Sequence, residues 1–228
     1  MKALQQKLAQ YTRPQEAKKQ GFYPYYKVIE SAQDTEILIE GKKHLMFGSN
    51  SYLGLTNHPK LKKAAKDAID KYGTGASGSR LLNGNLAIHE KLDTMLAEYV
   101  DKEAALTFST GFQVNMGVIS SILGRNDYLI IDDDDHASII EGARLTFAKV
   151  LKYKHNDMES LESVLQKTKS GKVKLIVVDG VFSMEGDLAP LDKIVELAEK
   201  YEASTMVDDA HGLGVMGPQG RGTSMHFG

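Results

Sequence analysis

The segment Val207-Asp-Asp-Ala-His-Gly212 ends a short apolar run, Ser204–Val207, that is typical of a β-strand. Two carboxylates, Asp208 and Asp209, stand where this strand should end, and His211 follows Asp208 by three residues. In an open α/β sheet, ligands bind beyond the carboxyl ends of the strands. A carboxylate at that place can pair with a protonated ring nitrogen of a ligand. The alternative interpretation is an ordinary strand–turn–helix connection whose acids are solvated.

Strand-like and helix-like segments alternate along the rest of the chain. Apolar and β-branched runs predict strands at residues 104–108, 127–131, 147–152, 173–178 and 204–207. Helical periodicity predicts helices at residues 86–100, 109–123, 137–145, 157–167 and 190–201. Such alternation is typical of an α/β fold in which right-handed crossovers join a mostly parallel sheet.

The N-terminal part predicts a different arrangement. Apolar residues recur at helical spacing over residues 2–11, so a helix is expected there, ending near Pro14. Two short strand signals, at residues 36–40 and 44–47, flank a turn at Gly41 and predict a small hairpin. The hairpin and the helix together resemble an arm rather than a layer of the main sheet.

Length and patterning predict one large domain with this arm. A helix is expected over residues 58–72, because Pro59 suits its first helical position. The 228 residues are 42% hydrophobic, which is enough to bury a sizeable core. We therefore divide the chain into an N-terminal arm, residues 1–50, and most of a ligand-binding large domain, residues 51–228.

Charge and composition exclude several classes of protein. A net charge of −2 provides no electrostatic argument for binding nucleic acid or an anionic membrane. The absence of cysteine excludes disulfides and thiolate metal sites, and fits a reducing cytosol. The N-terminus lacks the apolar stretch of a signal peptide, and no run approaches the roughly 18 apolar residues of a membrane span. We expect a cytoplasmic protein with no transmembrane segment.

A glycine-rich loop resembles a dinucleotide-binding fingerprint. Gly73, Gly75 and Gly78 spell G-x-G-x-x-G, which in a Rossmann fold follows a strand and opens a helix. Here a helix precedes the glycines, and the segment 81–85 separates them from the next helix. A loop that passes close to a ligand or a partner subunit is the preferred interpretation, and an NAD-dependent oxidoreductase is the alternative.

Residues 109–115, Ser-Thr-Gly-Phe-Gln-Val-Asn, lead from an expected strand into an expected helix. Small residues at such a turn expose backbone N–H groups at the positive end of the helix, which is a phosphate cradle in outline. Simple N-capping by Ser109 or Thr110 explains the same residues equally well.

Four acids and a histidine follow the strand expected at residues 127–131. Consecutive residues 132–135 cannot all converge on one metal ion, so no metal site is predicted. Most of these acids are explained by favourable interaction with the helix that follows. His136 differs, because an aromatic ring at the carboxyl end of a strand can stack on a planar cofactor.

Four elements thus stand at carboxyl ends of expected strands: residues 109–112, His136, Ser183 and the pair Asp208 and His211. Together they describe a site for a planar, phosphorylated cofactor. A carboxylate that keeps a pyridine nitrogen protonated lets pyridoxal phosphate withdraw electrons from a substrate carbanion. Pyridoxal 5′-phosphate is therefore the predicted cofactor.

Six ordered motifs resemble the α-oxoamine synthases, pyridoxal-phosphate enzymes of the aspartate aminotransferase fold (fold type I). The motifs cover almost the whole chain and are Asn50-Ser-Tyr-Leu-Gly-Leu, the loop 73–85, Ser109-Thr-Gly-Phe-Gln-Val-Asn, Asp135-His-Ala-Ser-Ile-Ile, Asp179-Gly-Val-Phe-Ser-Met-Glu-Gly-Asp and Val207-Asp-Asp-Ala-His-Gly. The resemblance implies decarboxylative condensation of an amino acid with an acyl-CoA, in a homodimer with its active site at the subunit interface.

The resemblance also implies roles for individual residues. Gly111 and Phe112, after Thr110, would meet the cofactor phosphate. His136 would stack on the ring, and Asp208 would pair with its nitrogen. Ser183 and His211 would approach the phenolic oxygen, and Asn50 would lie near the substrate. The residues implied as catalytic are His136, Asp208 and His211.

Within the family, several segments look most like the bacterial serine palmitoyltransferases of sphingolipid biosynthesis. Residues 22–26, 33–36, 46–52 and 124–128 carry this likeness. It implies L-serine and a long-chain acyl-CoA as substrates. The alternatives are 2-amino-3-ketobutyrate CoA ligase and 8-amino-7-oxononanoate synthase.

One family element has no counterpart in these 228 residues. The Schiff-base lysine of the family lies in a Ser/Thr-x-Ser-Lys segment downstream of the Asp-Ala-His motif, and no lysine stands between Asp208 and Gly228. We expect that lysine, and the C-terminal small domain, to lie outside this sequence. A catalytically incomplete partner subunit is the non-enzyme alternative.

Overall fold

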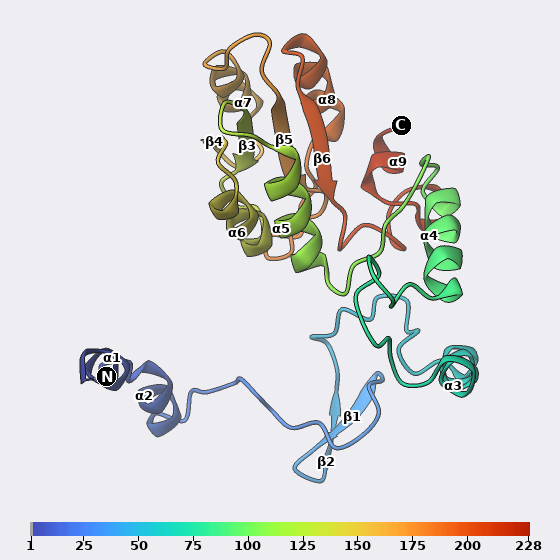
Figure 1. The fold of residues 1–228 in the computed structure, drawn as a ribbon. Coiled ribbons are helices and arrows are strands. Elements are labelled where there is room, and N and C mark those ends of the chain that lie inside the picture. Colours follow the sequence, from blue (N-terminus) through green and yellow to red (C-terminus); the bar gives the residue numbers. More distant parts are fainter. Residues whose placement is uncertain (1) are drawn as a thin grey trace. The chain divides into compact units, whose positions relative to one another are not determined.

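The computed structural model describes residues 2–228, and their contacts form two compact units, one ending at Thr74 and one spanning Gly75–Gly228 (Figure 1). Each unit is considered by itself. The division at residue 50 stays a prediction. No helix in the described range is both long enough and apolar enough to cross a bilayer.

The first unit consists of short helices and a hairpin. Its elements are α1 (Lys2–Ala9), α2 (Arg13–Lys19), β1 (Glu36–Ile39), β2 (Lys42–Leu45) and α3 (Pro59–Tyr72). The predicted hairpin is confirmed, since β1 and β2 pair antiparallel with Ile37 opposite His44. The helix predicted at residues 2–11 is confirmed and ends two residues early, at Ala9. Pro14 does not only stop this helix: it stands in the first turn of a second helix, α2, where its missing N–H costs nothing.

The second unit contains a four-stranded parallel sheet in the order β4-β3-β5-β6. Its strands are β3 (Tyr128–Asp132), β4 (Lys149–Tyr153), β5 (Lys174–Asp179) and β6 (Ser204–Asp208). Every residue of β3 and β5 is buried, as expected for central strands covered on both faces. The predicted parallel α/β sheet is therefore confirmed.

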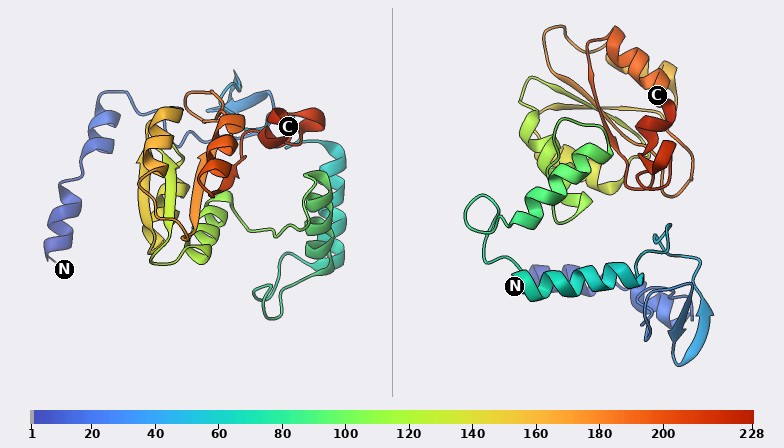
Figure 2. Two further views of the ribbon diagram at one scale, coloured as in Figure 1. Left: turned by 90° about the horizontal axis from the view of Figure 1, so that it is seen from above. Right: turned by 90° about the vertical axis from the view of Figure 1, so that its right-hand side faces the viewer.

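Helices cover both faces of this sheet (Figure 2). They are α5 (Gly111–Ile122) and α6 (Ala137–Leu145) on one face and α7 (Met158–Leu165) and α8 (Leu191–Lys200) on the other. The unit also contains α4 (Ala87–Tyr99), a 3-10 turn at Pro218–Gly220 and α9 (Thr223–Phe227). Ile130 and Ile176 pack with α7 and α8, whereas their neighbours Leu129 and Val177 pack with α5 and α6. The alternation of side chains along each strand separates these two cores.

The strand expected at Ala104–Phe108 is not formed among the described residues. The backbone N–H of Thr107 donates instead to Oδ1 of Asp93 on α4, at 2.9 Å. Leu106 is 66% exposed, so the apolar pattern that suggested a strand is not buried there. A side chain thus takes the hydrogen bond that a neighbouring strand would otherwise accept.

Candidate cofactor site

Asp208 ends β6 at the carboxyl edge of the sheet, directly beside Asp179 at the end of β5. Its Oδ2 accepts a hydrogen bond of 2.6 Å from Nδ2 of Asn115, and its Oδ1 accepts one of 3.1 Å from the backbone N–H of Ala210. Both carboxylate oxygens are thereby oriented by groups of the chain itself. The side chain remains only half-buried, so a ligand can still reach it.

Asn115 is a site residue that the sequence motifs did not single out. It lies on α5, is 2% exposed, and its Nδ2 also lies 2.8 Å from Oγ of Ser138. That hydroxyl lies 2.7 Å from Nδ1 of His136, so a chain of contacts joins Asp208 to His136. The sequence did contain a signal for Asn115. It is an amide within a largely apolar helix, and a polar side chain that becomes buried requires hydrogen-bond partners.

His136 is the N-cap residue of α6, and both its ring and its backbone are held by hydrogen bonds. Its ring Nδ1 accepts a hydrogen bond of 3.2 Å from the backbone N–H of Ser138, and its backbone N–H donates to Oδ2 of Asp179 at 2.8 Å. The residue as a whole is exposed. A planar ligand can therefore contact the ring without displacing a core residue.

The N-terminus of α5 has the features of an anion site. Oγ1 of Thr110 accepts the N–H of Gln113 at 3.1 Å, which confirms that Thr110 caps this helix. The N–H groups of Gly111 and Phe112 have no carbonyl within the helix to bond, because a helix begins there. No atom lies within 4 Å of the place a Cβ on Gly111 would take, so an anion has room to approach. Asn115 is about 6 Å further along the axis, at a rise of about 1.5 Å per residue.

The acids at this edge of the sheet influence one another. Burial, together with the charge of Asp208, raises the pKa of Asp179 to about 6 against the opposing effects of His136 and His211. His211 is half-buried and close enough to Asp179 to act on this carboxyl. The predicted residues His136, Asp208 and His211 therefore share one electrostatic environment.

Asp135, the residue before His136, stabilises the same edge of the sheet. Its Oδ1 accepts the N–H of Asp179 at 3.0 Å and its Oδ2 accepts the N–H of Asp132 at 2.9 Å, so it joins β5 to β3. Burial raises the pKa of Asp135 to about 8, although these two hydrogen bonds act to lower it. A carboxyl group that bridges two strands fixes the turn from which His136 projects.

Asp209 has a structural environment that separates it from its neighbour Asp208. Its Oδ2 accepts the N–H of Thr223 at 2.9 Å and its Oδ1 accepts the Thr223 hydroxyl at 2.7 Å. A Cβ on Gly212 would lie 2.1 Å from Oδ1 of Asp209, so this glycine permits the close packing. Burial raises the pKa of Asp209. Asp209 therefore anchors α9 and leaves Asp208 as the acid available to a ligand.

Two predicted residues stand apart from this network. Ser183 is exposed in the loop that follows β5, so it comes from the same edge of the sheet. Asn50 belongs to the first unit, and its place near the substrate stays a prediction. Among residues 2–228 no group of three or more acids or histidines has the arrangement of a metal site.

These residues match the needs of a planar, phosphorylated, nitrogen-containing group. Two backbone N–H groups at a helix start suit a phosphate, and an exposed imidazole suits a ring face. An oriented carboxylate suits a protonated ring nitrogen. The fingerprint Gly73–Gly78 follows α3 rather than a strand, so the dinucleotide interpretation lacks its structural context.

Known proteins with similar sequences belong to one enzyme family. Residues 42–226 match the family described as aminotransferase class I and II. A serine palmitoyltransferase from Sphingobacterium spiritivorum is 54% identical over 225 residues, which are 99% of this chain and 56% of that protein. One from Bacteroides thetaiotaomicron is 58% identical over all 228 residues and 58% of its length. An 8-amino-7-oxononanoate synthase from Thermoanaerobacter pseudethanolicus is 52% identical over 93% of the chain and 54% of its length.

Solved structures show the same fold. A serine palmitoyltransferase from S. paucimobilis with a bound PLP–myriocin aldimine superposes with a TM-score of 0.93 at 36% identity. The match covers 96% of this chain and 56% of that structure. The chain thus spans little more than half the length of the relatives that it matches.

Proposed function

Because the chain belongs to the aminotransferase class I and II family, we propose that it binds pyridoxal phosphate as part of an α-oxoamine synthase. The resemblance seen in the motifs and the predicted aminotransferase-like fold with its parallel sheet are both confirmed. The observation that carries the proposal is the oriented carboxylate of Asp208, joined through Asn115 and Ser138 to His136.

Bound pyridoxal phosphate supplies an electron sink for a negative charge that develops on the amino-acid substrate. In the proposal, the N–H groups of Gly111 and Phe112, beside Thr110, hold the phosphate at the positive end of α5. The ring of His136 would stack on the cofactor ring, and the carboxylate of Asp208 at the end of β6 would pair with the ring nitrogen.

Asp208 has the central role, because its negative charge keeps a proton on the ring nitrogen. Asn115 and Ala210 hold both oxygens of this carboxylate in place before any ligand binds, so little reorganisation is needed. Ser183 and His211 come from neighbouring loops of the same edge and are proposed to contact the phenolic oxygen. Such contacts would hold the cofactor ring at a second point besides its nitrogen.

The reaction we propose is condensation of an amino acid with an acyl-CoA, with release of carbon dioxide and free CoA. L-Serine and a long-chain acyl-CoA are the favoured substrates, supported by relatives named serine palmitoyltransferase at 54% and 58% identity. A relative named 8-amino-7-oxononanoate synthase at 52% identity supports the alternative. A glycine-dependent ketobutyrate ligase remains the third candidate.

The cellular location and the oligomeric state are also proposals. We expect a cytoplasmic homodimer, with the Schiff-base lysine contributed from outside the 228 residues. A catalytically incomplete partner subunit is the competing proposal. Retention of His136, Asp208 and His211 favours the enzyme, because a subunit without chemistry has no need of this constellation.

The test is CoA release by the full-length protein, loaded with pyridoxal phosphate and offered serine, glycine or alanine. Each amino acid is paired with a short or a long acyl-CoA. Fastest release with serine and a long thioester is the expected result. A clear preference for glycine with acetyl-CoA would instead identify a ketobutyrate ligase, and no release with any pair would favour the incomplete subunit.

A further inference from the structure

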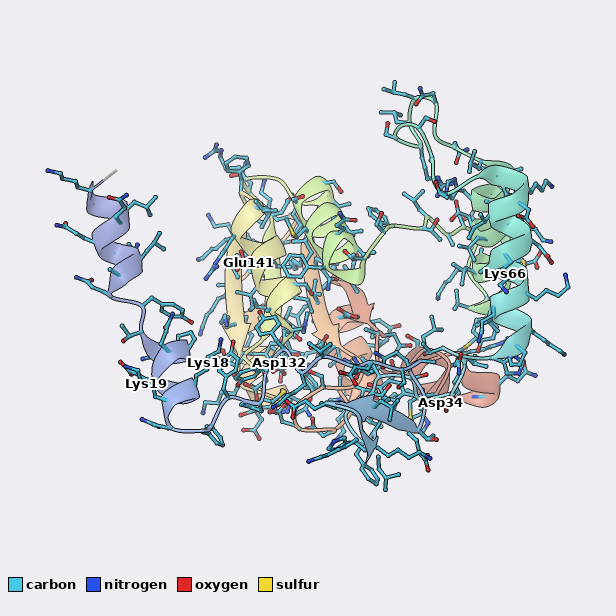
Figure 3. All side chains as sticks on the ribbon, turned by 90° about the horizontal axis from the view of Figure 1, so that it is seen from below. Lys18, Lys19, Asp34, Lys66, Asp132 and Glu141 are labelled. Carbon is cyan, nitrogen blue, oxygen red and sulfur yellow. The ribbon has the colours of Figure 1, made fainter. Side chains whose placement is uncertain are left out.

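A second polar cluster lies beyond the ends of β3 and β4, among residues to which no role has been given. His155 follows β4 and contacts two carboxylates at once. Its Nδ1 lies 2.9 Å from Oδ1 of Asp132, and its Nε2 lies 3.0 Å from Oδ2 of Asp187. Asp132, labelled in Figure 3, ends β3 and is fully buried, whereas Asp187 lies in the loop after β5. His155 therefore connects the sheet with that loop.

Asn156 makes the same connection a second time. Its backbone N–H donates to Oδ2 of Asp132 at 3.0 Å, and its Nδ2 donates to Oδ2 of Asp187 at 2.9 Å. The same Nδ2 lies 3.2 Å from the carbonyl oxygen of Leu188. Asn156 has a φ of +52°, a left-handed conformation that asparagine adopts more readily than most residues. Two consecutive residues thus bind both the strand end and the loop.

The loop itself is a compact piece of chain. The N–H of Phe182 donates to the carbonyl of Asp187 at 3.0 Å, and the N–H of Gly186 donates to that of Phe182 at 2.8 Å. Phe182 is 1% exposed, and its ring packs edge-on against His155 with centroids 4.4 Å apart. Ser183 is the next residue and is exposed. Any contact that fixes Phe182 and Asp187 therefore also fixes Ser183.

We propose that His155 and Asn156 are positioning residues that hold the loop of residues 180–189, and with it Ser183, at the carboxyl edge of the sheet. The inference rests on the proposed function, because the place of Ser183 matters only if a cofactor oxygen lies beside it. His155 and Asn156 touch no reacting atom themselves.

We call the contacts of His155 and Asn156 with Asp132 and Asp187 the clamp. Its His155 contacts depend on the charge of the imidazole ring. Both partners of His155 are carboxylates, and only an imidazolium donates from both nitrogens. Burial acts to lower the pKa of His155, but the hydrogen bonds to Asp132 and Asp187 outweigh it and raise the pKa. Asp134, whose Oδ2 lies 3.8 Å from Nδ1, also faces the ring. Both His155 contacts are formed below the ordinary pKa of histidine, and one of them is lost as the pH rises through the raised value, while the contacts of Asn156 remain.

Hydrogen exchange of the full-length protein without cofactor, read by mass spectrometry over peptides of residues 180–189, tests the clamp. After correction for the intrinsic pH dependence, the amides of Phe182 and Gly186 should exchange about tenfold faster once the ring loses its proton. In His155→Gln the exchange should be fast at every pH, with no step. Amides of β5 should stay protected in both proteins.

Two further variants keep the test decisive. Asp187→Asn alters only the exposed end of the clamp and leaves the contact of half-buried His155 with buried Asp132, so the variant should fold while its loop is loosened. Asp133→Asn is the matched control, because this neighbouring carboxylate pairs with Lys152 rather than with His155, and it should behave as the wild type. Wild-type exchange and an unchanged pH step in both His155→Gln and Asp187→Asn would overturn the proposal. Failure of the chain to bind pyridoxal phosphate would contradict the proposed function alone, because the exchange experiment contains no cofactor.

Discussion

The side-chain amide of Asn115 donates a hydrogen bond of 2.6 Å to the carboxylate of Asp208, 93 positions further along the chain. The same nitrogen lies 2.8 Å from the hydroxyl of Ser138. Because Asn115 is 2% exposed, water does not compete for these contacts. One amide therefore ties α5, α6 and β6 together at the point where the cofactor is proposed to bind.

Asn115→Ala should destabilise the second unit. The change removes both hydrogen bonds and leaves the hydroxyl of Ser138 and the carboxylate of Asp208 without that donor. We expect the free energy of unfolding to fall by about 1–3 kcal/mol, the usual cost of leaving buried polar groups unsatisfied. Urea unfolding followed by circular dichroism measures this change.

Ser121→Ala on the same helix is the control for Asn115→Ala. Ser121 is exposed, and its hydroxyl bonds only to the carbonyl of Val118 within α5, at 3.0 Å. Its substitution should change stability by about 0.5 kcal/mol or less. Equal unfolding midpoints for the two variants would show that the Asn115 contacts contribute nothing.

Asp208→Asn should impair turnover far more than cofactor binding. The neutral amide cannot hold a proton on the ring nitrogen, while the phosphate and stacking contacts remain. We expect turnover of the full-length protein to fall by about 100-fold to 1000-fold, as for other preorganised electrostatic contacts. Turnover and a spectroscopic titration with pyridoxal phosphate separate the two effects.

Asp209→Asn is the matched control for Asp208→Asn. The carboxylate of Asp209 accepts two hydrogen bonds from Thr223. Replacing this carboxylate should lower the free energy of unfolding by about 1–3 kcal/mol. Turnover of the folded protein should stay near the wild-type value. If the two variants lose turnover equally, the assignment of the ring nitrogen to Asp208 is wrong.

Asp135 should remain largely protonated at neutral pH in the folded chain. Burial raises its pKa to about 8 and that of Asp179 to about 6, so the folded state retains protons that the unfolded state releases. Their contribution to stability is complete below about pH 4 and is lost as the pH rises towards 8. Carboxyl-carbon NMR should find the midpoint of Asp135 near pH 8.

Asp34 is the control for Asp135, because its pKa is shifted in the opposite direction. Hydrogen bonds from the backbone of Thr35 and from Asn57 lower its pKa, so its carboxyl carbon should titrate below the usual range. A midpoint for Asp135 close to that of Asp34 would mean that the two backbone N–H groups on Asp135 outweigh its burial.

Arg80→Gln should loosen the glycine-rich loop around Gly78. The guanidinium contacts Asp93 at 2.7 Å, Asn85 at 2.8 Å and the hydroxyl of Thr107 at 3.0 Å, so it joins the loop to α4 and to the segment after it. We expect severalfold faster hydrogen exchange over residues 78–85. Arg80→Lys should loosen the loop as well, because an ammonium cannot supply this planar fork of donors.

Lys63→Gln is the control for Arg80→Gln. Lys63 forms an exposed i,i+4 ion pair with Asp67 on α3, at 2.7 Å, and such pairs contribute little. It should leave the exchange of residues 78–85 unchanged. Wild-type exchange in both arginine variants would show that the loop is held by its other contacts.

Much of the fold followed from the sequence alone. The parallel sheet was predictable because β-branched runs and helical periodicity are local signals, and the crossover rule converts their order into a topology. The helix at Ala137–Leu145 was expected at the same residues, and β5 differs from its expected range by one residue at each end. The cap at Thr110 was likewise visible in its residue type.

Local signals were insufficient where a distant side chain competes with the backbone. Ala104–Phe108 has the pattern of a strand, but Asp93 takes the N–H of Thr107, and the segment pairs with no strand in the described part of the chain. Pro14 was expected only to end a helix, and it stands in the first turn of a second one. Either outcome suits the residue type, so sequence alone could not choose between them.

The sequence by itself determined that His136, Ser183, Asp208 and His211 follow the carboxyl ends of strands, because that depends on strand order and length, whereas residues 109–112 follow no strand in the described part of the chain. It could not reveal that Asn115 bonds Asp208, that Asp209 bonds Thr223, or that His155 joins Asp132 to Asp187. These contacts join residues far apart in the chain. They exist only because packing on both faces of the sheet buries polar groups that must then find partners.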